Sequence, residues 1–114
     1  MKINEFINND NLKETFDRLK ENLLYEVAHL SNPYEKAKSK SSKEILSYGD
    51  DILPLLINEI KKGEYPALYT LYILVFNLIE KDSIKITENE AGNVSKIKKH
   101  IIDWWDNNKH NYGK

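Results

Sequence analysis

The sequence predicts an all-α fold, a compact bundle of about five helices in a single helical domain over residues 1–114. Apolar residues recur at helical spacing through most of the chain, and glycine and proline fall between these segments or in their first turns. The most apolar stretch, residues 49–79, predicts two helices joined by a turn at Gly63. We expect the remaining helices to cover this pair.

Residues 66–79 are expected to form the central helix, because their apolar side chains cover well over half of the circumference at about 100° per residue. These apolar residues are Leu68, Tyr69, Leu71, Tyr72, Leu74, Val75, Phe76, Leu78 and Ile79. A helix that is apolar on most sides must pack against neighbours on at least two of them. A membrane span needs roughly 20 apolar residues, so this shorter segment, interrupted by Thr70 and Asn77, predicts no membrane partner.

The N-terminal part is expected to contain an arm and a long helix. Residues 1–10 are predicted to be a short helix or ordered arm that ends at the turn-forming residues 8–10. Asn11 and Glu14 then match a capping box, which predicts the start of an amphipathic helix. The apolar stripe of this helix consists of Leu12, Phe16, Leu19, Leu23, Val27 and Leu30.

A second helix is predicted from Pro33 to Tyr48, since Ser31 and Asn32 are good N-caps and proline suits the first helical position. Its expected inner side consists of Tyr34, Ala37, Ser41, Ile45 and Tyr48. The serine-rich residues 39–42 weaken the helix. A break there, with Ser41 and Glu44 capping a restart, is the alternative.

The third helix is predicted between Gly49 and Gly63, with Asp50 as its N-cap and Pro54 in its first turn. Its inner face is expected to contain Ile52, Leu53, Leu56, Ile57 and Ile60. Leu55 projects from the opposite side of the helix, which predicts either a second contact layer or an exposed apolar patch.

The C-terminal part is expected to hold a surface loop over residues 81–92, a helix that begins at Asn93, and a polar tail over 107–114 that frays. The predicted inner face of the last helix consists of Val94, Ile97, Ile101, Trp104 and Trp105.

Composition excludes several classes of function. The chain has no cysteine, so it cannot form disulfides or a cysteine-based zinc site. Its net charge is −1 and Arg18 is its single arginine, which counts against a sequence-reading DNA-binding protein. A row of lysines at 36, 40 and 43 is compatible with weak nucleic-acid binding, but a solvated helix face explains it better because no aromatic residues interleave it. No signal peptide is recognised, so a cytoplasmic location is expected.

The helix pairs 33–62 and 66–106 resemble a short HEAT or armadillo-type array, with the N-terminal helix as a further layer. A closer resemblance is carried by residues 26–31 (EVAHLS), 45–49 (ILSYG), 53–56 (LPLL), 92–94 (GNV) and 104–105 (WW). These segments are similar to a group of small bacterial all-helical proteins with E-T-A-H-L-S, H-P-x-Y-Q-x-I-I-x-M-G and P-L-I-L-x-E-L segments. The chain departs from that pattern at Ser39, Lys40 and Ser42. Because the group has no assigned activity, the resemblance implies a fold and leaves the function open.

The leading hypothesis is a non-enzymatic protein–protein interaction module, of which an inhibitor or neutralising partner is one form. The helical array favours it, as do the out-of-stripe Leu55 and the two tyrosines expected at the surface, Tyr25 and Tyr65. We expect a protein partner and no cofactor.

The rival hypothesis is a hydrolase-like or metal-assisted enzyme that uses Glu26 and His29. These residues are three positions apart on one helix, where a carboxylate and an imidazole can share proton-transfer chemistry. Structural hydrogen bonds at the helix end are the favoured explanation. His100, Asp103 and Asp106 are likewise better explained by structural roles than by a metal site, because they lack a recognised ligand spacing.

Overall fold

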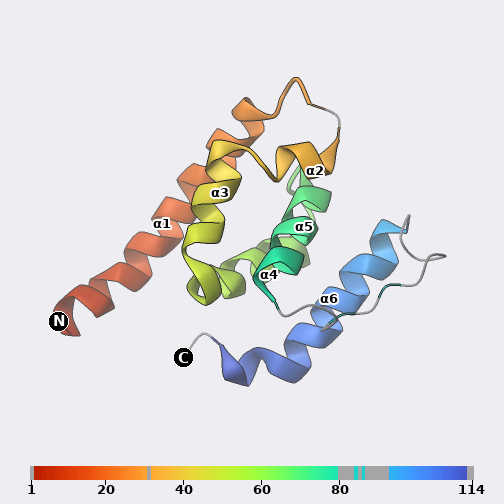
Figure 1. Cartoon of the computed structure of the whole chain (residues 1–114). Coiled ribbons are helices and arrows are strands. Elements are labelled where there is room, and N and C mark those ends of the chain that lie inside the picture. Colours follow the sequence, from red (N-terminus) through yellow and green to blue (C-terminus); the bar gives the residue numbers. More distant parts are fainter. Residues whose placement is uncertain (1, 31, 80–83, 85, 87–92, 113–114) are drawn as a thin grey trace.

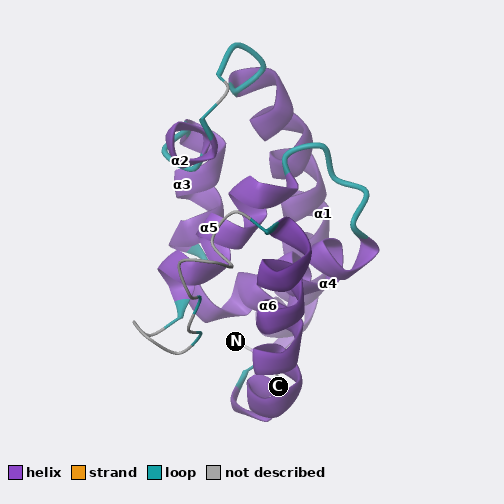
Figure 2. Ribbon diagram, turned by 90° about the vertical axis from the view of Figure 1, so that its right-hand side faces the viewer, coloured by secondary structure: helices purple, strands orange, loops and turns teal. Residues whose placement is uncertain are grey.

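The computed structural model describes the chain except for residues 1, 31, 80–83, 85, 87–92 and 113–114, and except for the side chains of residues 2–10 and 33 (Figure 1). The described residues form helices and no strand, which confirms the all-α prediction (Figure 2). The elements are α1 (Lys2–Glu26), α2 (Pro33–Lys36), α3 (Lys40–Ser47), η1 (Gly49–Ile52), α4 (Leu53–Lys62), α5 (Leu68–Leu78), α6 (Val94–Asn108) and η2 (Lys109–Asn111).

Helix α1 is continuous from Lys2 to Glu26, so the predicted arm over residues 1–10 and the predicted start at Asn11 are wrong. The reason is that asparagine and aspartate cost a helix well under about 1 kcal/mol each relative to alanine. Without glycine or proline, residues 8–10 do not stop it. The predicted apolar stripe is correct in its middle: Phe16, Leu19, Leu23 and Val27 are buried.

The segment 33–48 is broken, as the alternative for this segment predicted, but the residue that caps the restart is Ser39. The Ser39 side chain accepts a hydrogen bond from the Ser42 backbone N–H at 3.3 Å. The break turns α2 relative to α3, so one helical period no longer describes both pieces. Tyr34 and Tyr48 are exposed, which corrects their predicted place on the inner side, whereas Ala37, Ser41 and Ile45 are buried as predicted.

Helix α4 follows a short 3₁₀ turn, η1, that contains Asp50, so the predicted capping by Asp50 is wrong. Pro54 lies in the first turn as predicted, and Gly63 ends the helix with a φ of 68°. The predicted inner face is at most 1 % exposed throughout: Ile52, Leu53, Leu56, Ile57 and Ile60. Leu55 is half-buried and packs against the core, so it belongs to a second contact layer.

Helix α5 is the central helix, as predicted. Every residue from Thr70 to Val75 is buried, and α5 packs against α2, α3, α4 and α6 (Figure 1). Burial of α5 also leaves two hydroxyls, Thr70 Oγ1 and Tyr72 Oη, without a hydrogen-bond partner among the described residues. Within the described parts of the chain, no helix combines the length and the apolar character needed to cross a bilayer.

Helix α6 begins at the predicted cap, where the Asn93 side chain accepts a hydrogen bond from Lys96 N–H at 3.1 Å. The predicted fraying of the tail is wrong for residues 107–112. The turn η2 brings the Tyr112 ring to 5.7 Å from Trp104 and 6.0 Å from Trp105, measured between ring centroids. The predicted loop 81–92 lies mostly outside the described residues, although Ile84 and Ile86 in it pack against the core.

A buried ion pair joins α1 to α4. Lys20 Nζ lies 2.6 Å from Glu59 Oε1, and the two side chains are 15 % and 11 % exposed. Burial alone would lower the pKa of Lys20. Glu59, and then Asp17, raise it above its ordinary value, each through a hydrogen bond and a negative charge. The Lys20 ammonium therefore stays charged at neutral pH, and its contact with Glu59 fixes the two helices to each other.

Removal of one partner of this ion pair is expected to destabilise the fold strongly. Lys20→Met leaves the buried Glu59 with only a long contact of 3.9 Å to the exposed Lys62, and it should lower the free energy of unfolding by about 3 kcal/mol. The double variant Lys20→Met/Glu59→Leu should recover most of this loss, whereas Lys13→Met, which removes an exposed ion pair with Asp17, should leave stability unchanged. Urea unfolding measures all three. Equal, small losses for Lys20→Met and Lys13→Met would contradict a stabilising role for the ion pair.

Candidate functional site

Glu26 and His29, the candidate catalytic pair, are not hydrogen-bonded to each other in the structure. The Glu26 carboxylate accepts hydrogen bonds from the Ser41 backbone N–H at 2.9 Å and from the Ser41 hydroxyl at 2.6 Å. His29 is exposed in the turn that follows α1. The carboxylate thus ties the end of α1 to the first turn of α3, which is a structural role for Glu26 but not for His29.

The environment of Glu26 does not suit acid–base chemistry at neutral pH. Burial alone would raise the pKa of Glu26, but the two hydrogen bonds from Ser41, and the positive charge of Lys40, bring it below its ordinary value. An efficient general base needs a pKa near the working pH. At neutral pH Glu26 therefore acts as a charged anchor for the N-terminus of α3, where a negative charge is favourable.

Two of the three residues considered for a metal site, Asp103 and Asp106, are used in ion pairs. Asp103 accepts a hydrogen bond from Lys99 Nζ at 2.8 Å. Asp106 lies 3.8 Å from both Lys61 and Lys109. In the described part of the chain, no three histidine or acidic residues are grouped in a way that would hold a metal ion.

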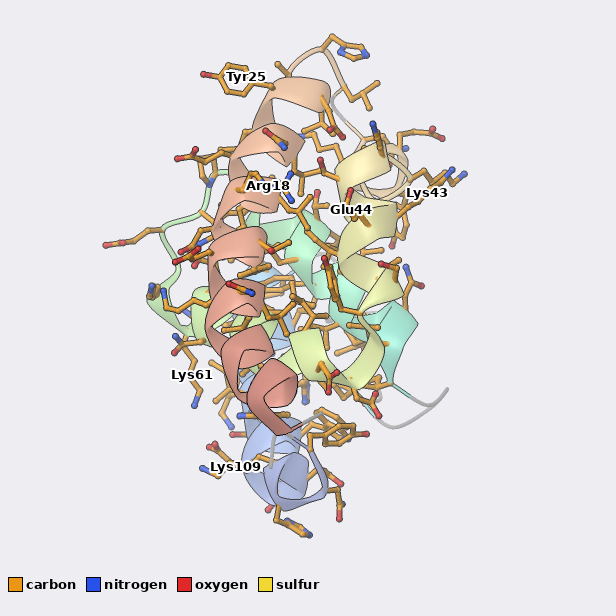
Figure 3. All side chains as sticks on the ribbon, turned by 90° about the vertical axis from the view of Figure 1, so that its left-hand side faces the viewer. Arg18, Tyr25, Lys43, Glu44, Lys61 and Lys109 are labelled. Carbon is orange, nitrogen blue, oxygen red and sulfur yellow. The ribbon has the colours of Figure 1, made fainter. Side chains whose placement is uncertain are left out.

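The three residues predicted to bind a partner have different surroundings. Tyr25 is 85 % exposed near the end of α1, as expected (Figure 3). Tyr65 is 8 % exposed and its hydroxyl donates a hydrogen bond to the Lys20 carbonyl at 2.7 Å, so its predicted exposure is wrong. Burial, and then the negative charge of Glu59, raise the pKa of Tyr65, which keeps this hydroxyl a donor. Leu55 is half-buried.

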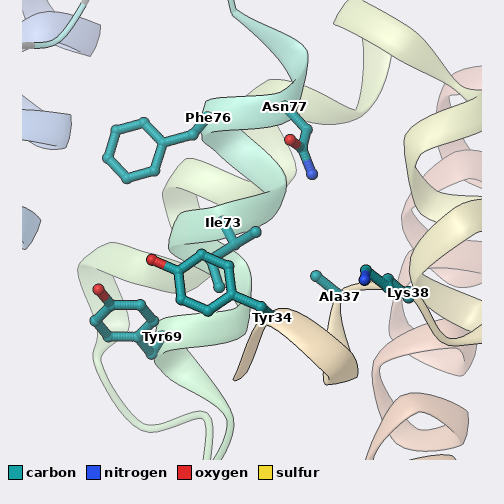
Figure 4. A pocket seen from close by; sticks show the side chains of 7 residues that line it. All are labelled: Tyr34, Ala37, Lys38, Tyr69, Ile73, Phe76 and Asn77. Atoms are coloured by element: carbon teal, nitrogen blue, oxygen red, sulfur yellow. The ribbon is translucent and has the colours of Figure 1, made fainter. Parts of the chain in front are cut away.

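A concave feature lies elsewhere, between α2 and α5, and has a volume of about 310 Å³ (Figure 4). Its lining comes from α2 and the turn after it, and from one side of α5: Tyr34, Ala37, Lys38, Tyr69, Ile73, Phe76 and Asn77. Apart from Lys38 and Asn77, this lining consists of aromatic and aliphatic side chains. None of Tyr25, Leu55 and Tyr65 belongs to it.

Three tyrosine rings lead from this pocket into the core. The Tyr34 and Tyr69 ring centroids are 6.5 Å apart in an edge-to-face arrangement, and those of Tyr69 and Tyr72 are 5.7 Å apart. Burial, and then a hydrogen bond with Tyr34, raise the pKa of Tyr69, and burial raises that of Tyr72. Tyr69 and Tyr72 are therefore neutral at physiological pH, and the Tyr34 ring, 58 % exposed, is held by the Tyr69 ring beneath it.

Sequence periodicity missed this pocket because it treated residues 33–48 as one helix with Tyr34 inside. The break before α3 leaves α2 only four residues long, too short to cover the neighbouring side of α5. A signal was present in α5 itself, since Tyr69 and Phe76 extend its apolar surface beyond one stripe. A helix that is apolar on so many sides needs long neighbouring helices, and the break leaves only the short α2 on one of these sides.

No protein-family model, no curated protein and no solved structure matches this chain. The resemblance to small bacterial helical proteins and to HEAT-type arrays therefore stays a prediction.

The Glu26 anchor predicts a specific dependence of stability on pH. Because the pKa of Glu26 is lower in the folded chain than its ordinary value of 4.5, its contribution is present above that value and is lost as the pH falls through the folded-state pKa. Glu26→Gln should lose about 2 kcal/mol at neutral pH, from a hydrogen bond to a charged group. Between about pH 5 and about pH 3, the free energy of unfolding of Glu26→Gln should fall only by the amount that the remaining carboxylates of the chain cause.

Denaturant unfolding across this pH range checks the expectation. Glu21→Gln, an exposed position on the same helix, is the matched control and should follow the wild-type curve. Parallel curves for wild type and Glu26→Gln would show that the carboxylate does not anchor α3.

Proposed function

We propose that this chain is a non-enzymatic protein-interaction module, and that the pocket between α2 and α5 receives an apolar side chain of the partner. The observation that carries the proposal is the exposed Tyr34 ring beside a pocket lined by Tyr69, Ile73 and Phe76 (Figure 4). Aromatic residues at a concave, largely apolar surface are typical of the energetic centres of protein interfaces.

The composition of the pocket supports binding over catalysis. Among the described lining residues there is no carboxylate, imidazole, serine or threonine hydroxyl, so the usual nucleophiles and acid–base pairs are missing. The raised pKa of Tyr69 also disfavours a phenolate base. What the lining offers is apolar contact area, hydroxyl donors, one ammonium and one amide.

Tyr34 combines two properties that favour a role as an anchor. Its exposed ring can lose a large accessible area when a partner covers it, and its contact with Tyr69 already restricts it in the free protein. A side chain that is ordered before binding loses less conformational entropy on association. An inhibitor or neutralising partner is one form of this function, and it requires a stoichiometric complex.

Affinity purification from the native host at native expression level tests the proposal. The wild-type chain should retain a stoichiometric protein partner, and Tyr34→Ala should weaken that complex by about tenfold or more, as expected for an interface anchor. Circular dichroism should show unchanged helix content for the variant, because Tyr34 is largely exposed.

Tyr25→Ala is the matched control, since it removes an equally large ring that is still more exposed and lies outside the pocket. It should retain the partner. A partner that is lost with Tyr25→Ala and kept with Tyr34→Ala would place the interface at the end of α1 and refute the assignment to the pocket.

A further inference from the structure

Positive charge is concentrated beside the pocket. Residues 33–43 contain four lysines (36, 38, 40 and 43) and one acidic residue, Glu35, a net charge of +3. The whole chain carries −1, so the remaining residues together carry −4. The α2–α3 corner is therefore more basic than the rest of the chain on average, and two carboxylates lie at its edge: Glu26, which is held at Ser41 near Lys40, and Glu44.

Much of this charge is not neutralised within the fold. Lys36 and Lys43 form no ion pair with any other residue that the structure describes, and Lys38 has a long, exposed contact of 3.8 Å with Glu35. Exposed pairs of this kind contribute little and exchange readily for other partners. Lys43 projects from the side of α3 that faces away from α1, whereas Glu44 faces Arg18 on α1 (Figure 3).

The pocket itself has one charged lining residue, and it is basic. In Figure 4, Asn77 on α5 and Lys38 after α2 both lie to the right of the rings of Tyr34, Tyr69 and Phe76. Three aromatic rings can also attract a cation. Here the Lys38 ammonium lines the same space and no acidic residue among the described lining offsets it, so a cationic ligand is disfavoured.

The size of the pocket limits what enters it. At about 310 Å³ it lies at the lower end of the range for ligand sites, roughly 300–1,000 Å³. This space fits one bulky side chain with part of its backbone and is small for a dinucleotide-sized cofactor. A partner must therefore place one apolar group in the pocket and the rest of its chain across the rim.

We propose that the partner contributes an acidic segment, with a bulky aromatic or aliphatic side chain in the pocket and aspartate or glutamate residues beside it on Lys38 and the lysines of the α2–α3 corner. This inference rests on the proposed function and specifies the chemistry of the partner. The apolar side chain supplies contact area against Ile73 and Phe76, and charge complementarity selects the partner and its orientation.

A single-stranded nucleic acid is the competing occupant, because it too combines negative charge with flat apolar groups. The geometry favours the acidic protein segment. Tyr34 and Tyr69 meet edge to face, with 65° between their planes, so they do not present parallel faces on which successive bases could stack. The negative charge of the rest of the chain also opposes a long polyanion more than a short acidic segment.

Selection from a random display library of dodecamer peptides on the intact protein tests the inference. Selected peptides should contain an aromatic or large aliphatic residue flanked by aspartate and glutamate. Their affinity, measured by fluorescence anisotropy, should fall with rising salt. Lys38→Glu and Lys43→Glu should each weaken binding by about fivefold. Lys109→Glu, at the opposite end of the molecule, should not change it (Figure 3).

The outcomes separate this inference from the function on which it rests. Peptides that need Tyr34 but show no acidic enrichment would refute the acidic partner and leave the interaction module standing. A selection that yields no peptide sensitive to Tyr34→Ala would refute both. Equal losses with Lys43→Glu and Lys109→Glu, or tighter Tyr34-dependent binding of a thymidine dodecamer than of any peptide, would also overturn the acidic-segment proposal.

Discussion

The burial of α5 on almost every side is the constraint on which the rest of the structure depends. A helix with six consecutive buried residues cannot be solvated on any of the sides they occupy, so α3, α4 and α6 must each present an apolar face to it. Each fully buried leucine, isoleucine or valine contributes roughly 1.5–3 kcal/mol relative to an exposed one. Where a neighbour is too short to complete this cover, apolar surface of α5 stays accessible. That is the side on which the pocket lies.

The short neighbour has its origin in a few polar residues. Ser39 caps a new helix, and Glu26 binds the first turn of that helix through Ser41. Helix α2 therefore ends at Lys36, and α3 begins in a new direction. This break turns Tyr34 away from the core and onto Tyr69. A serine-rich sequence, a capping interaction and a carboxylate anchor therefore explain why one side of α5 is an aromatic pocket rather than a packed interface.

Local rules predicted the parts of the fold that depend on local physics. The period of the apolar residues predicted the inner face of α4 and the central place of α5. Capping preferences predicted the end of α4 at Gly63 and the start of α6 after Asn93. Two failures are local, the arm over residues 1–10 and the cap at Asp50, and the others involve contacts between distant residues. Tyr65 is buried because its hydroxyl reaches the Lys20 carbonyl 45 positions away, and residues 107–112 are ordered because Tyr112 packs on the two tryptophans. The pocket was missed for the same reason, since Tyr34 and Tyr69 meet only after the break has turned α2.

The measurement that tests the central claim most directly is the reactivity of single cysteines along α5, which the absence of native cysteine makes unambiguous. Leu74→Cys lies on a fully buried position and Asn77→Cys at the pocket rim. In native buffer the thiol at position 77 should be modified by a maleimide at close to the rate of an unfolded peptide. The thiol at position 74 should react at least about a hundredfold more slowly, at the rate set by unfolding. Equal rates at the two positions would show that α5 is not enclosed by the bundle.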